Sequence, residues 1–170
     1  MKTLILYAYC ENQKGPTSCK NSKDNLTFFL DNGLINNSDY QFRINVNGIS
    51  TFDFSKYLEK YENLKIFYGQ GKSAHDGWSN ILNKNDNYDF FIFLKDKVRG
   101  PYHIDKINDW INYFISHLND ENKLICCGFG VSPEGKLYKF PYFTEKCFCI
   151  DRDIYTLLKN NKFLNKISYD

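Results

Sequence analysis

The stretch YDFFIFLKDKVRGPY, residues 88–102, decides how the rest of the chain is interpreted. Its apolar run FFIFL contains no polar residue, which predicts a strand that is buried on both faces of a sheet. The run ends abruptly in Lys95 and Asp96, and an Arg-Gly-Pro turn follows. The stretch therefore predicts a central strand over Tyr88–Leu94 whose carboxyl end presents a carboxylate.

Shorter apolar runs and turn signals on either side of this stretch predict alternating strands and helices. Further strands are expected at residues 3–9, 40–46, 64–68 and 124–128, helices at 24–30, 54–61, 76–83, 105–118 and 153–159, and a short hairpin within 136–150. This order predicts an α/β fold with a mostly parallel central sheet covered by helices on both faces. At 170 residues and 42% hydrophobic content, residues 1–170 are expected to form one domain.

The charge and hydropathy of the chain exclude several classes of function. A net charge of +2 with scattered lysines does not predict nucleic-acid binding. No apolar segment approaches the roughly 18 residues of a membrane span, and the apolar run near the amino terminus is too short for a secretory signal. We therefore expect a cytoplasmic protein. The six cysteines lack C-x-x-C spacing, so free thiols are expected rather than zinc ligands or disulfides.

The candidate ligand contacts are the residues that follow the predicted strands, because open parallel sheets bind ligands beyond the carboxyl ends of their strands. After the first two strands these residues are Tyr9, Glu11, Asn47 and Gly48. After the central strand, the carboxylate of Asp96 is the kind of ligand that Mg²⁺ and Mn²⁺ prefer. The planar guanidinium of Arg99 suits a phosphate or a carboxylate. The alternative is a solvated turn in which Asp96 and Arg99 form an ion pair.

A second candidate site lies in IFYGQGKSAHDGW, residues 66–78. A phosphate-binding P-loop requires a glycine where this chain has an isoleucine, so the loop is too short to wrap a phosphate. Lys72 and the backbone N–H groups of the next helix can still meet one. His75 and Asp76 are candidate catalytic groups, with a simple helix-capping role as the alternative for Asp76. Trp78 either stacks on a base or fills the core.

Several stretches lie in a characteristic order around the central one, among them LYAYCEN (6–12), FRINVNG (42–48), AHDGWSNIL (74–82) and KLICCGFGV (123–131). The ordered set resembles the glycosyltransferase-like domains of large DNA viruses and of algae and other microbes. It is similar to the rhamnosyltransferase domain of a chlorovirus glycosylation protein. The resemblance spans nearly the whole chain, and RGP after the apolar strand is its sharpest part.

This resemblance implies a GT-A-like, Rossmann-like fold that binds a UDP- or GDP-linked nucleotide-diphosphate sugar and transfers the sugar to a glycan or glycoprotein hydroxyl. It implies an acidic motif that grips Mn²⁺ or Mg²⁺ on the pyrophosphate, and Asp96 takes that place here. Lys95 and Lys97 replace the motif's polar neighbours, and their ammonium groups can offset diphosphate charge directly. Asp76 or His75 would face the sugar, one of them as general base. If the chain is viral, the cytoplasm is that of the host.

Two alternatives stay open. The flanking lysines and the short chain favour a GT-A-like module that binds a nucleotide or sugar without turnover. A nucleotide kinase or ATPase would be built on Gly71-Lys72-Ser73. The residues predicted to contact the donor or its nucleotide are Tyr9, Glu11, Asn47, Gly48, Lys72, Trp78, Lys95 and Arg99.

Overall fold

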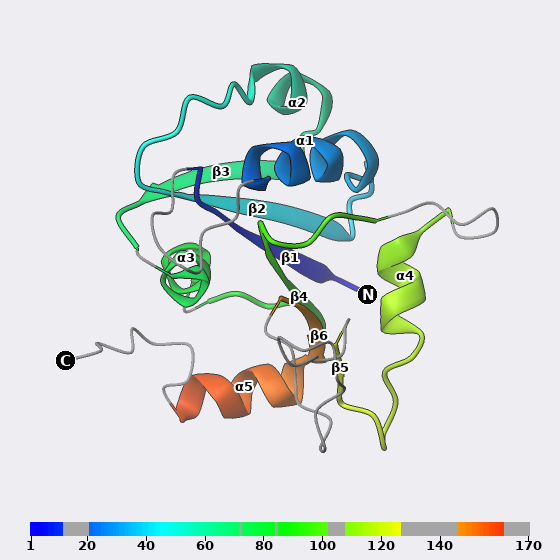
Figure 1. The fold of residues 1–170 in the computed structure, drawn as a ribbon. Coiled ribbons are helices and arrows are strands. Elements are labelled where there is room, and N and C mark those ends of the chain that lie inside the picture. Colours follow the sequence, from blue (N-terminus) through cyan, green and yellow to red (C-terminus); the bar gives the residue numbers. More distant parts are fainter. Residues whose placement is uncertain (12–20, 72, 84, 102–107, 127–145, 162–170) are drawn as a thin grey trace, which may run out of the picture.

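A computed structural model describes residues 1–11, 21–71, 73–83, 85–101, 108–126 and 146–161. Six strands form one sheet, and helices cover both of its faces (Figure 1). The strands are β1 (Thr3–Tyr9), β2 (Tyr40–Asn47), β3 (Leu64–Gly69), β4 (Phe90–Lys95), β5 (Leu124–Cys126) and β6 (Cys147–Asp151). The helices are α1 (Ser22–Asn32), α2 (Ser55–Lys60), α3 (Ala74–Ile81), α4 (Trp110–Ile115) and α5 (Arg152–Asn160). The predicted three-layer α/β/α arrangement is confirmed.

The strand order of the sheet is β3-β2-β1-β4-β6-β5. Strands β1 to β4 are parallel, while β6 runs antiparallel to both β4 and β5. The chain therefore builds outward from β1 to β3 and then returns to the other side of β1 to form β4. This reversal places a topological switch point between the carboxyl ends of β1 and β4, which is where open α/β sheets bind their ligands.

The central stretch folds as predicted, with β4 paired to β1 on one side and to β6 on the other. Four of its six residues are buried. The segment predicted as a short hairpin contributes β6, and residues 127–145 lie outside the described part of the chain. The helix predicted over 105–118 is shorter, Trp110–Ile115, because Asp109 caps its start and Ser116 its end; residues 102–107 lie outside the described part of the chain.

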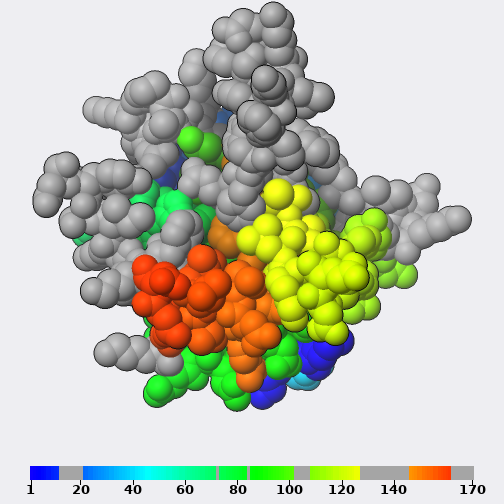
Figure 2. Space-filling model, turned by 90° about the horizontal axis from the view of Figure 1, so that it is seen from below, coloured from blue at the N-terminus to red at the C-terminus, as the bar shows by residue number. Residues whose placement is uncertain are grey.

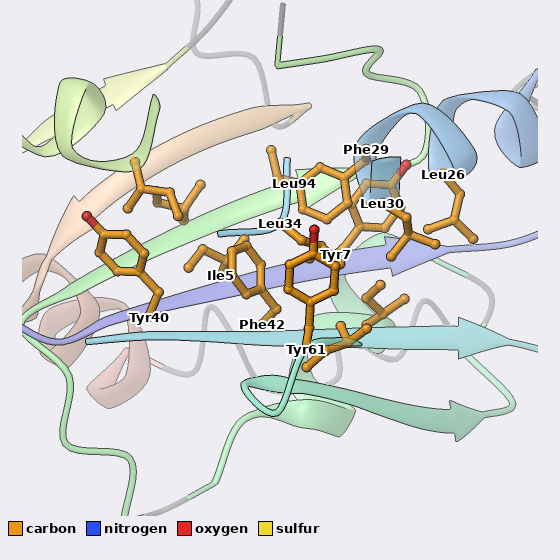
Figure 3. Packing of buried hydrophobic residues seen from close by; sticks show 14 of the residues in the cluster. Ile5, Tyr7, Leu26, Phe29, Leu30, Leu34, Tyr40, Phe42, Tyr61 and Leu94 are labelled. Atoms are coloured by element: carbon orange, nitrogen blue, oxygen red, sulfur yellow. The ribbon is translucent and has the colours of Figure 1, made fainter. Parts of the chain in front are cut away.

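Two hydrophobic cores lie on opposite faces of the sheet. The larger core joins the sheet to α1, α2 and α4, and Figure 3 shows Tyr7, Phe29 and Leu94 packed together between α1 and the sheet. The smaller core joins the other face to α3 and α5 through Trp78, Phe93 and other apolar residues. Seen from below, α5 (orange) covers this second face beside the segment that leads into β5 (yellow) (Figure 2). Both faces of β1 and β4 are therefore covered.

Strand β2 is apolar on one face only. Phe42, Ile44 and Val46 join the larger core, whereas Arg43, Asn45 and Asn47 are buried polar residues at the alternate positions. Because successive side chains point to opposite faces of a strand, these three polar side chains lie together on the α3 side. The polar face of β2 supports the site described next.

The described helices include none that is long and apolar enough to cross a membrane. Within the described residues, the predicted free thiols are confirmed for Cys10, Cys126, Cys147 and Cys149. Cys19 and Cys127 lie outside the described residues.

Candidate functional site

Asp96 lies at the switch point, immediately after β4. Its carboxylate oxygen Oδ2 accepts a hydrogen bond of 3.1 Å from the backbone N–H of Cys10, the residue that follows β1. Its own backbone N–H donates to the carbonyl of Ala8 at 3.1 Å. The two bonds join the carboxyl ends of the neighbouring strands, and Asp96 is only 7% exposed. The sheet therefore holds this carboxylate in a fixed position at the ligand-binding edge.

The environment of Asp96 acts on its charge in two opposing directions. Burial raises the pKa of Asp96 above its ordinary range, while the Cys10 N–H and the ammonium groups of Lys97 and Lys95 act to lower it. Burial is the largest of these effects, because removal from water penalises the ionised form. The two lysines that the sequence placed beside Asp96 are thus close enough to act on its charge.

Helix α1 reinforces this end of the sheet through its first turn. The hydroxyl of Ser22 donates to the carbonyl of Cys10 at 3.0 Å, and the side-chain amide of Asn25 donates to the carbonyl of Asp96 at 2.8 Å. Both side chains are buried. One helix therefore holds the ends of β1 and β4 together. Sequence reasoning missed Ser22 and Asn25, whose only sequence signal is that they are polar residues in the first turn of the helix.

Glu11 connects the end of β1 to the loop after β2. Its carboxylate accepts hydrogen bonds from the hydroxyl of Ser50 at 2.6 Å and from the backbone N–H and hydroxyl of Thr51 at 2.7 Å each. The ammonium group of Lys23 lies 3.8 Å away. The Ser50 hydrogen bond is the largest cause that lowers the pKa of Glu11 to about 2. In this conformation the Glu11 carboxylate is held by the loop after β2, and its predicted contact with the nucleotide stays a prediction.

Asn47 and Gly48 end β2 at the same edge of the sheet. The side chain of Asn47 accepts from Asn45 at 2.7 Å and donates to the carbonyl of Ser73 at 3.1 Å, so it fixes the start of α3. Asn45 in turn accepts a bond of 2.6 Å from Asn80. Gly48 has a φ of 77°, and a Cβ added there would meet only open space. This asparagine chain was not predicted, although Asn45 and Asn47 alternate along β2.

Helix α3 begins with a reciprocal capping box. Ser73 is the N-cap, its hydroxyl accepts from the backbone N–H of Asp76, and Asp76 accepts from the backbone N–H of Ser73. The hydrogen bonds of Asp76 therefore favour its helix-capping alternative. Ser73 is the N-cap, and Asp76 is the third helical residue, N3, of the capping box. The ring of His75 lies edge-on to Trp78 with centroids 5.2 Å apart. A catalytic role for His75 or Asp76 stays a prediction, and Lys72 lies outside the described residues.

Two predicted nucleotide contacts prove to be core residues. Trp78 is fully buried, its indole N–H donates to the carbonyl of Leu94 at 3.1 Å, and its ring packs against Phe93 and Phe148. A ring without exposed surface offers no face to a base, so the core alternative holds for Trp78. Tyr9 is also fully buried. Its predicted place beside a nucleotide therefore depends on its main chain rather than its ring.

Arg99 does not form the ion pair with Asp96 that the sequence left as an alternative. Its guanidinium carbon lies 4.5 Å from the centroid of the Phe28 ring, on α1. Within the described residues, Arg99 pairs with no carboxylate, and the charges that act on Asp96 are those of Lys97 and Lys95. Arg99 therefore belongs to the α1 side of the turn rather than to the Asp96 carboxylate.

A divalent cation at Asp96 would find few protein ligands. In the part of the chain that the structure describes, no group of three or more His, Cys, Asp or Glu side chains is arranged to hold a metal ion. Asp96 offers one carboxylate that already accepts a backbone N–H, whereas Mg²⁺ requires about six oxygen ligands. The described residues do not form a metal site by themselves, and the predicted Mn²⁺ or Mg²⁺ stays a prediction.

Comparison with solved structures identifies proteins of the same fold. TarS 1–349 from S. aureus is 15% identical with a TM-score of 0.50, over 95% of this chain and 49% of that chain. A 4-diphosphocytidyl-2C-methyl-D-erythritol synthase from Anaerococcus prevotii DSM 20548 is 14% identical with a TM-score of 0.50, over 99% of this chain and 78% of that chain. The chain thus spans about half the length of the TarS chain. A scan against protein-family models finds no match, and a search of curated proteins finds none.

Proposed function

We propose that this chain is a glycosyltransferase that uses a nucleotide-diphosphate sugar. The observation that carries the proposal is the position of Asp96 at the switch point between β1 and β4, where it is held by the Cys10 N–H and by Asn25 of α1. Ligands of open α/β sheets bind at this point. The fold is shared with TarS, a glycosyltransferase. The link to viral and algal relatives remains a prediction from the sequence.

The charges around Asp96 suit a diphosphate leaving group. The nucleoside would lie across the ends of β1 and β2, beside Cys10 and Gly48, and the diphosphate would extend toward Lys95 and Lys97. Their ammonium groups would stabilise the negative charge that develops as the bond to the sugar breaks. In this arrangement the charge of Asp96 would act on the two lysines, and its fixed carboxylate would take part in donor binding.

The proposed transfer forms one bond and breaks one. The acceptor hydroxyl oxygen forms a bond to the anomeric carbon of the sugar, and the bond from that carbon to the diphosphate oxygen breaks. The electron pair of the broken bond leaves with the nucleoside diphosphate, and the hydroxyl proton passes to a base. His75 and Asp76, at the start of α3, remain the candidate bases, and the donor is proposed to be UDP- or GDP-linked.

A nucleotidyltransferase is the second candidate function. It is favoured by the likeness to the diphosphocytidyl-methylerythritol synthase, of which this chain covers 78%. Such an enzyme joins a phosphorylated acceptor to a nucleoside triphosphate and releases pyrophosphate. The P-loop kinase has less support, because the hydroxyl of Ser73 accepts the Asp76 N–H in the capping box. A binding module without turnover remains the outcome to expect if a nucleotide sugar binds and is never cleaved.

The two enzymatic proposals differ in the product that is released. The purified chain is incubated separately with UDP-, GDP- and CDP-linked sugars and with nucleoside triphosphates plus sugar phosphates, each with Mn²⁺ and with EDTA. Release of a nucleoside diphosphate supports the glycosyltransferase, and release of pyrophosphate supports the nucleotidyltransferase. Asp96→Asn should abolish either activity. Asp89→Asn, at the amino end of β4, is the matched control and should retain it. Failure of every nucleotide sugar to bind would overturn the proposed function.

A further inference from the structure

A cavity lies on the α1 side of the sheet, and the turn that follows Asp96 forms part of its lining. Its volume is about 210 Å³. Its inner wall is made by apolar and aromatic side chains from α1, α4 and three strands: Tyr7, Phe29, Leu94, Trp110, Phe114 and Cys147. All but Phe114 are less than one tenth exposed. The cavity is therefore embedded in the larger core, and Figure 3 shows three of its wall residues under α1.

The turn after β4 forms the outer wall of this cavity. Val98, Gly100 and Pro101 are half-buried, and Arg99 is exposed. Exposure thus rises from the inner wall to this turn, so the turn is the entrance. The Arg99 guanidinium lies over the Phe28 ring and pairs with no carboxylate among the described residues. A cation consequently stands at the entrance of an apolar chamber.

The size of the cavity limits what it can hold. An apolar cavity of about 150 Å³ in another protein stays dry and binds benzene. A chamber of about 210 Å³ therefore accommodates one aromatic ring with a short substituent, but not a nucleoside or a lipid chain. Its aromatic walls offer ring edges and faces to an aromatic guest. The guanidinium at the entrance can form charge-assisted hydrogen bonds with a carboxylate or similar anion.

We propose that this cavity is a binding site for a small aromatic acid, whose ring lies against Tyr7, Phe29 and Trp110 and whose anionic group meets Arg99. The proposal does not depend on the nucleotide-sugar function. The two sites use different groups: Asp96 and its lysines at the end of the sheet, and Arg99 with the apolar wall on the α1 side. Leu94 and Val98, each two positions from Asp96, are the lining residues nearest to it in the sequence.

Three related compounds separate the contributions of ring and charge. Phenylacetate has both, phenylacetamide has the ring without the charge, and acetate has the charge without the ring. Each is titrated into the 15N-labelled protein while the two tryptophan indole N–H signals are followed. Trp110 lines the cavity, whereas Trp78 lies in the core on the other face and its indole N–H donates to the carbonyl of the lining residue Leu94, so its signal should move much less than that of Trp110. A Trp110→Phe variant assigns the signals.

We expect phenylacetate to shift the Trp110 signal much more than the Trp78 signal, and to bind at least fivefold more tightly than phenylacetamide and acetate. Arg99→Gln should remove the preference for phenylacetate over phenylacetamide. Val98→Phe, which fills the cavity from the turn, should abolish binding of both. Lys60→Gln, which removes a cation that lies over the Tyr61 ring elsewhere, should change nothing.

Three results would overturn the proposal. One is equal movement of both indole signals, which would indicate nonspecific binding. Another is an acetate titration that matches phenylacetate, which would leave an anion contact without a ring site. The third is an unchanged preference in a folded Arg99→Gln protein. The two-dimensional spectrum itself reports whether each variant is folded, so a loss of binding through unfolding is recognised directly.

Discussion

The side-chain amide of Asn25 in α1 donates a hydrogen bond of 2.8 Å to the backbone carbonyl of Asp96 at the end of β4. The two residues are 71 positions apart in the sequence, and both are buried. A buried carbonyl without a partner costs free energy, so this bond fixes the main chain of Asp96 as well as the packing of α1. Asn25 is therefore a positioning residue for the candidate site.

Asn25→Ala should lower the free energy of unfolding by about 1–3 kcal/mol, because it removes the hydrogen bond to the buried Asp96 carbonyl. It should also weaken binding of the nucleotide sugar beyond what the loss of stability explains. Asn32→Ala is the control in the same helix, since its amide donates to the helix carbonyl of Phe28. Urea unfolding and donor titration measure the two effects. Equal donor affinity in the folded Asn25→Ala and Asn32→Ala proteins would contradict the positioning role.

Asp96→Asn should raise the thermal midpoint at neutral pH while it abolishes donor binding. Burial raises the pKa of Asp96, so the folded state holds this proton more tightly than the unfolded chain does. The contribution of Asp96 to stability is thus greatest below its unfolded pKa, about 4, and is lost as the pH rises through its folded value. Asparagine carries no charge at any pH and avoids that loss.

The pH dependence tests this explanation. The variant should melt above wild type at pH 7, and the difference should close as the pH falls below about 4. A change of about 1 kcal/mol moves the midpoint of a domain of this size by about 2–4 °C, which calorimetry resolves. A variant that melts below wild type at pH 7 would show that the Cys10 hydrogen bond outweighs the burial of the charge.

Glu11→Gln should destabilise the protein at neutral pH, which is the opposite of the effect expected for Asp96→Asn. Hydrogen bonds from Ser50 and Thr51 lower the pKa of Glu11 to about 2, so its contribution is fully present above the unfolded value of about 4.3 and is lost as the pH falls toward 2. At pH 7 the variant should lose about 1–3 kcal/mol. The difference from wild type should shrink between pH 4 and pH 2 in urea unfolding. Glu59→Gln, exposed on α2, should stay within about 0.5 kcal/mol throughout.

The sequence predicted the fold because its main signals are local. The apolar run of β4 and the alternation of strands with helices follow from hydrophobic periods that need no knowledge of partners. The insertion of β6 between β4 and β5 was not predicted, because strand neighbours far apart in the chain leave no local pattern. In the candidate site, too, local signals were predicted and contacts between distant segments were not. Asp96 was found from its place after a strand, whereas Ser22 and Asn25 act on residues of distant segments.

Trp78 and Arg99 show where residue type and sequence position mislead. Trp78 follows a strand and lies near a turn, which favours a ligand contact, but its burial depends on packing against Phe148 of β6. Arg99 lies three residues from Asp96, which favours an ion pair, yet its guanidinium lies on Phe28 of α1. In both cases the deciding contact is with an element that the sequence could not place beside the residue.

The buried pair Arg43–Asp86 provides a final prediction, since it supports the polar face of β2 under α3. The two nitrogens of the guanidinium each donate to one carboxylate oxygen at 2.7 Å, and Arg43 also donates to the carbonyl of Ile81 at 2.8 Å. Both side chains are less than one tenth exposed. Asp86→Asn should lower the free energy of unfolding by about 3–5 kcal/mol, because it leaves the Arg43 charge buried and uncompensated.

The pair Arg152–Asp89 is the matched control, because it has the same chemistry with both side chains nearly half exposed. Asp89→Asn should cost at most about 1 kcal/mol, since water and salt screen an exposed pair. Urea unfolding at low and high salt compares the two variants. The Asp86→Asn deficit should persist in 1 M salt, because buried pairs are screened much less than exposed ones. A deficit that is equal for the two variants, or that salt removes from both, would mean that water reaches Arg43 and that the polar face of β2 is held by its asparagines instead.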